Sequence, residues 1–166
     1  MAAAVGALGA GLASMALGSA RGEASSGLAA AEVAGLMEGL LARVDRDAEA
    51  YARYLAARAA RADLGAAIEG SIAVPRQVAE LALAALERLA AGIATVRPRL
   101  ASEAVTSAQA LLACVEGATF TARSNLPGLS DPRAREERRG ELCTLAVRAR
   151  ELARAIRDHG LLEPDR

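Results

Sequence analysis

The stretch GLAAAEVAGLMEGLLARVDRDAEAYARYLAARAA, residues 27–60, decides the fold class. Its larger apolar residues recur every three or four positions, which is the spacing of one face of an α-helix. A helix of this length spans about 50 Å, because each residue adds about 1.5 Å. A fold of short helices cannot accommodate it. The sequence therefore predicts a bundle of long helices whose core includes Val33, Met37, Leu40, Val44, Tyr51 and Leu55.

The composition extends this prediction to the whole chain. The 166 residues include 44 Ala, 23 Leu and 20 Arg, but no Trp, one Phe and two Tyr. Ala, Leu and Arg favour helices, whereas strands favour the scarce aromatic residues. We therefore expect an all-α domain over residues 1–166, a bundle of about five helices with two of them long. The other predicted helices cover residues 2–18, 63–94, 103–123 and 132–159.

Charge and cysteine usage exclude several classes of protein. The 20 basic residues balance the 20 acidic ones, whereas a nucleic-acid-binding protein usually carries a basic excess. Cys114 and Cys143 match no metal or redox spacing, and we expect both to be buried free thiols in a reducing compartment. The sequence shows no metal cluster, phosphate-binding loop or Ser-His-Asp arrangement. These features predict a cytoplasmic protein without a metal, a prosthetic group or a nucleic-acid partner.

The first twenty residues and the helix at 103–123 are both poor in charge. A secretory signal usually has a basic start and a stronger apolar centre than residues 1–20 provide, so we expect a buried helix and no membrane partner. In the helix expected at the start of the chain, Gly6, Gly9 and Ala10 would allow close backbone contact.

The helix at 103–123 is apolar nearly all round, and such a helix belongs in a bundle centre or a subunit interface. We therefore expect a homodimer, because one short chain has too little core for this apolar surface.

Two residues break the helical patterns. Asp47 falls between Val44 and Tyr51 on the face that should be buried. A buried carboxylate is either paired with a cation or protonated, so Asp47 is either half of a structural ion pair or a candidate general acid. Pro75 interrupts the helix at 63–94 and predicts a kink near Ser71, whose carbonyl loses its amide partner.

The ends of the helix at 103–123 carry further candidates. In one interpretation, Ser102 caps the start of this helix and the Glu103 carboxylate complements its dipole. In the other, Glu103 is a functional carboxylate and Ser102 is its neighbour in the site. At the other end, Arg123 either binds a substrate carboxylate in a two-pronged hydrogen bond or caps the helix carbonyls. Asn125 is either a C-cap residue or a binding residue. The residues alone leave these alternatives open.

Taken in order, several motifs resemble the formiminotetrahydrofolate cyclodeaminase family, which includes methenyltetrahydrofolate cyclohydrolases. They are the small-residue motif AAAVGALGAGLASM at 2–15, VDRDAEAY at 44–51, IAVP at 72–75 and the block from Ser102 to Leu126. The resemblance implies a dimeric helical bundle with a tetrahydrofolate derivative as substrate, bound in a cleft near the subunit contact. In the implied reaction, N10 closes on the formimino carbon and ammonia leaves.

The resemblance also implies roles for the candidate residues. Asp47 and Glu103 would deliver a proton to the leaving nitrogen and place a carboxylate near the cationic amidine. Arg123 and Asn125 would hold the pterin or the glutamate tail, with Ser71 and Ser102 also binding the substrate.

The sequence departs from the family pattern at several points. The glycine-rich loop that precedes the first helix is missing, since Met1 stands where the loop's last Ser would be, and Glu103 and Thr121 replace the family's Asp and Asn. Such a loop offers bare backbone amides to a ligand. The expected function is thus cyclodeaminase, with a cyclohydrolase or a non-catalytic binding protein of the same fold as alternatives. An unrelated exported Ala-rich bundle is a further alternative, and a longer gene product carrying the loop is one explanation of the departure.

Overall fold

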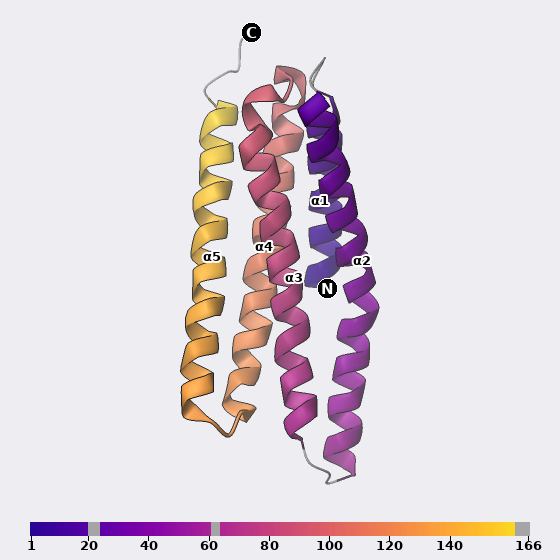
Figure 1. Cartoon of the computed structure of the whole chain (residues 1–166), viewed down its shortest axis with the longest axis vertical. Helices are drawn as coiled ribbons and strands as arrows, with labels where there is room; N and C mark the ends of the chain where they lie inside the picture. Colours follow the sequence, from indigo (N-terminus) through magenta and orange to yellow (C-terminus); the bar gives the residue numbers. More distant parts are fainter. Residues whose placement is uncertain (20–23, 61–63, 162–166) are drawn as a thin grey trace.

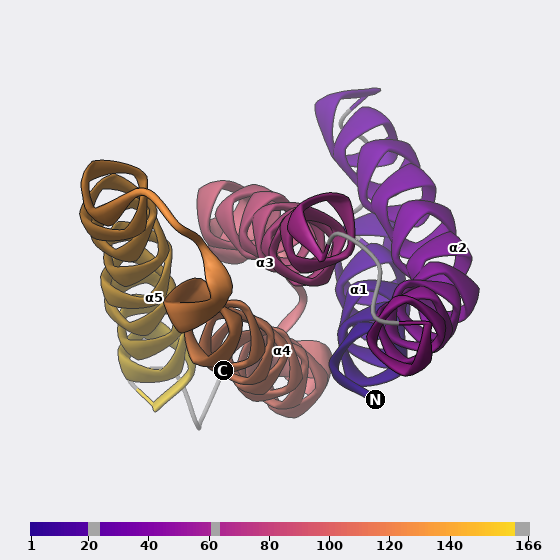
Figure 2. The ribbon, with the colours of Figure 1, turned by 90° about the horizontal axis from the view of Figure 1, so that it is seen from below.

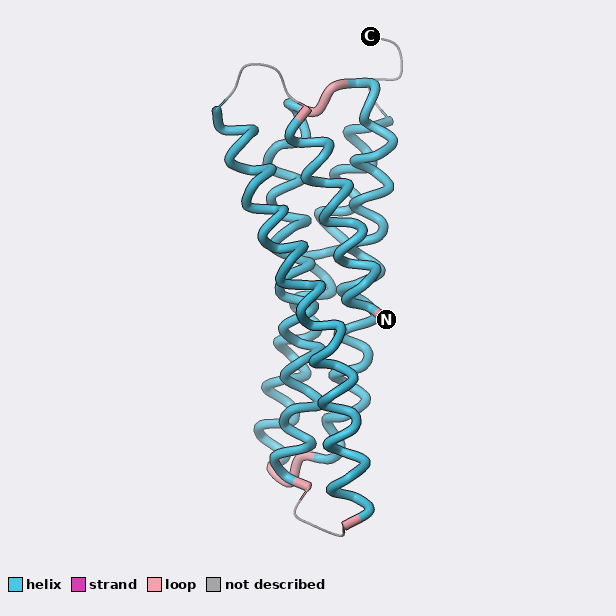
Figure 3. Tube along the Cα trace, turned by 90° about the vertical axis from the view of Figure 1, so that its right-hand side faces the viewer, coloured by secondary structure: helices cyan, strands magenta, loops and turns pink. Residues whose placement is uncertain are grey.

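A computed structural model describes residues 1–19, 24–60 and 64–161, without the side chains of residues 24–26, 47 and 161. These residues form five α-helices, and no strand occurs among them (Figures 1 and 3). The prediction of an all-α bundle of five helices is confirmed. The helices are α1 (Ala2–Gly18), α2 (Ala24–Ala59), α3 (Gly65–Gly92), α4 (Ala101–Asn125) and α5 (Pro132–Leu161), with short 3₁₀ turns η1 (Ile93–Thr95), η2 (Pro98–Leu100) and η3 (Leu126–Gly128).

Helix α1 packs against α2 and α4 through small residues. A Cβ atom added to Gly6 would lie 2.5 Å from Cys114 Sγ, and one added to Gly9 would lie 3.0 Å from Leu111 Cγ. The Ser107 hydroxyl of α4 donates a hydrogen bond to the Gly9 carbonyl at 2.7 Å. Gly6, Gly9 and Ala10 are all buried. The prediction that glycines bring this helix close to its neighbours is therefore confirmed.

Helix α1 covers only the first half of α2. The two helices run antiparallel, with Gly18 beside Ala30, Gly11 beside Met37 and Gly6 beside Leu40. Met1 is therefore level with about residue 46 of α2, and the N-terminus lies near the middle of the bundle (Figure 1). The second half of α2 extends beyond the end of α1.

The predicted core of α2 is consequently wrong at its lower end. Val33 and Leu40 are fully buried, as expected, because α1 covers them. Tyr51 and Leu55, however, are 64% and 46% exposed, because the helical stripe continues past the point where α1 begins. These two side chains are free to line a surface site.

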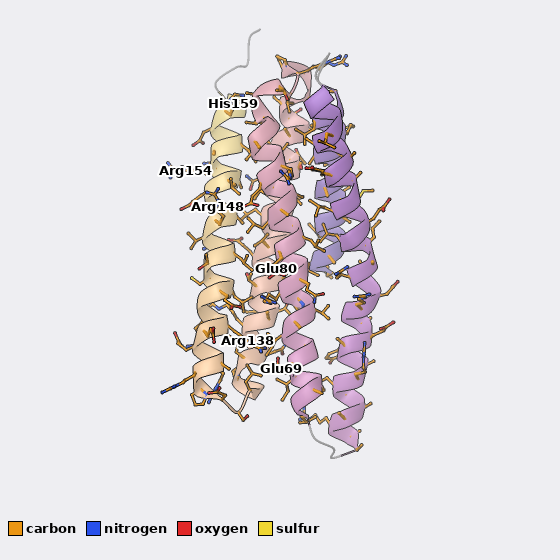
Figure 4. All side chains as sticks on the ribbon, viewed as in Figure 1. Glu69, Glu80, Arg138, Arg148, Arg154 and His159 are labelled. Atoms are coloured by element: carbon orange, nitrogen blue, oxygen red, sulfur yellow. The ribbon has the colours of Figure 1, made fainter. Side chains whose placement is uncertain are left out.

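Helix α5 lies at one side of the bundle, against α3 and α4 (Figure 2). Leu142, Ala149 and Ile156, at helical spacing, form a narrow buried seam on α5. Ion pairs flank the seam, with Arg138 beside Glu69 of α3 (Figure 4) and Arg150 Nε 2.6 Å from Glu116 of α4. Exposed pairs contribute little stability each, so the apolar seam is the main attachment of α5.

Local signals at the helix ends and cysteines gave mixed outcomes. Asp131 Oδ1 accepts a hydrogen bond from the Arg133 amide at 2.9 Å, so Asp131 caps the N-terminus of α5. Both cysteines are free, but only Cys114 is buried, and burial raises the pKa of its thiol to about 12. The expectation that Cys143 is buried is wrong, since it lies on the exposed face of α5.

Among the helices described, none combines the length and the apolar character that a membrane span needs.

Candidate functional site

Two pockets follow one another along the seam between α3 and α4, below the start of α1. The upper pocket has a volume of about 110 Å³. It begins at Met1 and is bounded by Pro75 of α3 and Thr121 of α4, with Ala2, Ala3, Val78 and Ala118 completing its lining. It exists because α1 stops here while α3 and α4 continue.

The lower pocket is larger, at about 200 Å³. Tyr51 and Tyr54 of α2 form one wall, and the opposite wall combines polar and small residues of α3, α4 and η3, namely Ile68, Ser71, Ser124, Asn125 and Gly128. The lining residues of the two pockets lie on consecutive turns of the same faces of α3 and α4. We call the two pockets together the α3–α4 groove.

The structure brings Ser71 and Asn125 together at the lower pocket. The Asn125 side-chain amide donates a hydrogen bond to the Ser71 carbonyl at 2.9 Å. That carbonyl is the one that Pro75 leaves without a helical N–H partner, as the sequence predicts. Asn125 is the last residue of α4, and its side chain bonds across to α3. The C-cap interpretation of this side chain is therefore wrong.

Ser102 and Glu103 lie at the opposite end of α4 from this groove. They are 22 residues or more from Asn125 on one continuous helix, which corresponds to about 33 Å. Within one chain, Glu103 and Asn125 therefore cannot contact the same small substrate. The predicted site residues form two groups at opposite ends of α4.

Glu103 is held in its ionised form. The Ser102 hydroxyl donates to the Glu103 carboxylate at 2.7 Å. This bond, followed by one from the backbone amide of Glu103, lowers the pKa of the carboxyl group. Ser102 does not cap the helix, because α4 begins at Ala101 and its N-cap residue Leu100 has no side-chain cap bond. A carboxylate in this state suits a charge partner for a cation better than a proton donor.

The other two candidates are less constrained. Arg123 is exposed and does not line the groove, and its guanidinium has no hydrogen bond or ion pair with any residue that the structure describes. It therefore does not cap the carbonyls of α4. The side chain of Asp47 lies outside the described residues, but its backbone in α2 is level with Met1 and hence with the upper pocket.

The sequence analysis missed several lining residues of the groove. Tyr54 follows Tyr51 by three positions and therefore lies on the same side of α2, and Ser124 adjoins the predicted Asn125. Both signals were available in the sequence.

In the described part of the chain, no group of three or more His, Cys, Asp or Glu side chains is placed to hold a metal ion.

Comparisons with known proteins agree with this architecture. The profile of the formiminotransferase-cyclodeaminase family matches residues 1–144. A solved structure of formiminotetrahydrofolate cyclodeaminase from Thermotoga maritima superposes with a TM-score of 0.85 and 19% sequence identity, covering 97% of this chain and 86% of that one. At that identity the similarity establishes the fold. No curated protein sequence matches the chain.

Proposed function

The chain belongs to the formiminotransferase-cyclodeaminase family, and from this premise we propose that it converts 5-formimino-tetrahydrofolate to 5,10-methenyltetrahydrofolate and ammonia. The observation that carries the proposal is the α3–α4 groove, which combines two tyrosine side chains with polar groups of Ser71, Ser124 and Asn125. Tyrosines can contact a flat pterin ring through their faces, while the polar groups orient it.

The proposed reaction needs a proton donor at the leaving nitrogen. N10 of the folate attacks the formimino carbon of the cationic amidine and gives up its proton, the terminal nitrogen accepts a proton in exchange, and the bond from the carbon to that nitrogen breaks so that it leaves as ammonia. We assign the proton delivery to Asp47, whose backbone position is level with the upper pocket. Glu103, whose pKa is lowered, takes the role of the carboxylate beside the cationic amidine. Arg123 takes the glutamate tail of the folate.

Folate binding is tested first, by the melting temperature of the chain with 5-formyl-tetrahydrofolate. Ligand at about one hundred times its Kd stabilises the fold by about 2.7 kcal/mol, which raises the melting temperature by about 5–10 °C. Tyr51→Ala is expected to weaken binding about tenfold, because it removes an aromatic contact in the groove. Val147→Ala on α5, another exposed apolar position, is the matched control. If 5-formyl-tetrahydrofolate does not raise the melting temperature of the folded wild-type chain, a folate function is refuted. A comparison of turnover of formimino-tetrahydrofolate and of methenyl-tetrahydrofolate then separates a cyclodeaminase from a cyclohydrolase.

The outer face of α1 supports a homodimer. No residue from Ala2 to Gly18 is charged, and apart from Leu17 the buried residues of the helix are all Ala or Gly. Met1, Leu8 and Met15 are spaced by seven residues and are 94%, 65% and 49% exposed. The neighbouring α4 adds Phe120, which is 72% exposed. Because exposed apolar side chains gathered on one side of a helix are typical of association surfaces, and because no side chain of α1 is charged, we assign a second copy of this chain to this face.

A dimer also offers a solution to the separation of Glu103 from the groove. A two-fold axis that crosses the middle of α4 would place the Glu103 end of one copy beside the Asn125 end of the other.

The dimer is tested by light scattering. The wild-type chain is expected to show twice the 16.9 kDa chain mass at micromolar concentration. Leu8→Glu is expected to give a monomer that remains helical, because it places two charges in the centre of the interface without disturbing the core. Val147→Glu should remain dimeric. A monomeric wild-type chain, or dimeric Leu8→Glu, would contradict the assignment.

A further inference from the structure

The bond between Asn125 and Ser71 fixes more than the distance between two helices. In a continuous α-helix the N–H of residue 75 would bond to the carbonyl of Ser71, four residues earlier. Proline has no N–H, so the part-buried Ser71 carbonyl needs a donor from outside its own helix. The Asn125 amide, 54 residues away in sequence, takes that place at 2.9 Å.

This bond determines which way the Asn125 side chain is turned. A carbonyl oxygen can only accept, so the atom of Asn125 that faces Ser71 must be the nitrogen. The Ser71 hydroxyl does not compete, because it donates to the Ile68 carbonyl at 2.7 Å. The Asn125 Oδ1 has no donor among the residues described, and Asn125 lines the lower pocket. The pocket thus contains a hydrogen-bond acceptor of defined orientation.

We propose that Pro75 is a positioning residue for the groove: by leaving the Ser71 carbonyl free, it holds the Asn125 amide so that Oδ1 accepts a hydrogen bond from an N–H group of the ligand. The ligand part of this inference rests on the proposed function. Its specificity consequence is that the lower pocket selects ligands with an N–H donor over ligands of the same shape that only accept. Pro75 acts through Asn125 and does not contact the ligand's reacting atoms.

The arrangement is tested without ligand by a double-mutant cycle on Pro75 and Asn125. Asn125→Ala alone is expected to lower the melting temperature by about 3 °C, because it removes the hydrogen bond to the part-buried Ser71 carbonyl. In the Pro75→Ala background the helix supplies that donor itself, so Asn125→Ala should then change the melting temperature by less than half as much. An equal loss in both backgrounds would overturn the proposal, since the two residues would then act independently.

The positioning role is tested by affinity for 5-formyl-tetrahydrofolate. Pro75→Ala is expected to melt no lower than the wild-type chain, yet to bind about tenfold more weakly, because the Asn125 amide is no longer required at Ser71 and is free to turn. Because Pro75 also lines the upper pocket, loss of its ring as a wall would weaken binding equally in the Asn125→Ala background, whereas a positioning role predicts no further effect of Pro75→Ala there. Pro98→Ala, in η2 at the other end of the bundle, is the control and should bind normally.

The two proposals fail in different ways. Unchanged affinity in Pro75→Ala would overturn the positioning role even where the wild-type chain binds folate. If the wild-type chain binds no folate, the proposed function and the ligand part of this inference both fall, while the ligand-free cycle still decides whether Pro75 orients Asn125.

Discussion

Turnover of 5-formimino-tetrahydrofolate is expected to fall by about 10²–10⁴-fold in Asp47→Asn, which is the usual effect of removing a general acid. Asparagine has nearly the same size as aspartate but has no acidic proton to deliver to the leaving nitrogen. The helical circular dichroism and the melting temperature of the variant should remain close to those of the wild-type chain. Steady-state kinetics on the purified variant measure the loss directly.

Asp45→Asn is the matched control for this substitution. Asp45 lies two residues away on the same helix, and its side chain is exposed. Its substitution should leave turnover unchanged. Full activity in Asp47→Asn would eliminate the proton-donor assignment.

A mixing experiment extends this test to the second copy. If Glu103 acts on the groove of a partner subunit, Asp47→Asn and Glu103→Gln chains are each inactive alone. When they are unfolded and refolded together, half of the dimers contain one chain of each kind, and each of those has one intact site. About a quarter of the wild-type activity should therefore return, as two-fold symmetry requires. If no activity returns, Asp47 and Glu103 do not act together in a site shared between two subunits.

Gly6→Val is expected to lower the free energy of unfolding by about 3 kcal/mol, as overpacking of a close contact does. A Cβ at this position already lies 2.5 Å from Cys114 Sγ and 3.3 Å from a Leu40 methyl group, and valine adds two further methyl groups. Helices α1, α2 and α4 meet at this point, so the strain cannot be relieved by moving one side chain. Urea unfolding of the variant measures the loss.

The control for Gly6 is a glycine with free space around it. Gly35 in α2 has no atom within 4 Å of its added Cβ. Gly35→Ala should therefore raise the free energy of unfolding by about 0.5–1 kcal/mol, because alanine is the better helix former. Adding Cys114→Ala to Gly6→Val should restore part of the lost stability. A gain in Gly6→Val of the same size as that in Gly35→Ala would show that helix propensity, and not close packing, governs Gly6.

Much of the fold could be predicted from local sequence, because helix periodicity and glycine spacing are local properties. The bounds of α1 and the close packing of its glycines against neighbouring helices followed from such signals. The exposure of Tyr51 and Leu55 could not, because it depends on how far α1 extends along α2, which is a property of tertiary packing. The stripe on α2 has the same appearance whether or not another helix covers it.

Only the local features of the candidate site could be predicted from the sequence. Pro75 indicated a free carbonyl at Ser71, but its partner, Asn125, lies on another helix, and no local pattern identifies such a partner. The separation of Glu103 from Asn125 was available from the sequence in principle, since both belong to one helix of known rise. The resemblance to the family placed them in one site, and only the geometry of a single chain showed that they are far apart.

The packing of α2 has a consequence for how the groove opens. Among the described residues, α1 contacts the first half of α2, while the second half packs against α3 and keeps Tyr51 and Leu55 exposed. Segments with fewer buried contacts undergo local opening at a lower free-energy cost than the rest of a protein. The wall that carries Tyr51 and Tyr54 can therefore swing outward while the packed upper half stays intact. Admission of a ligand to the groove then requires a fluctuation of about four helical turns, not of the whole bundle.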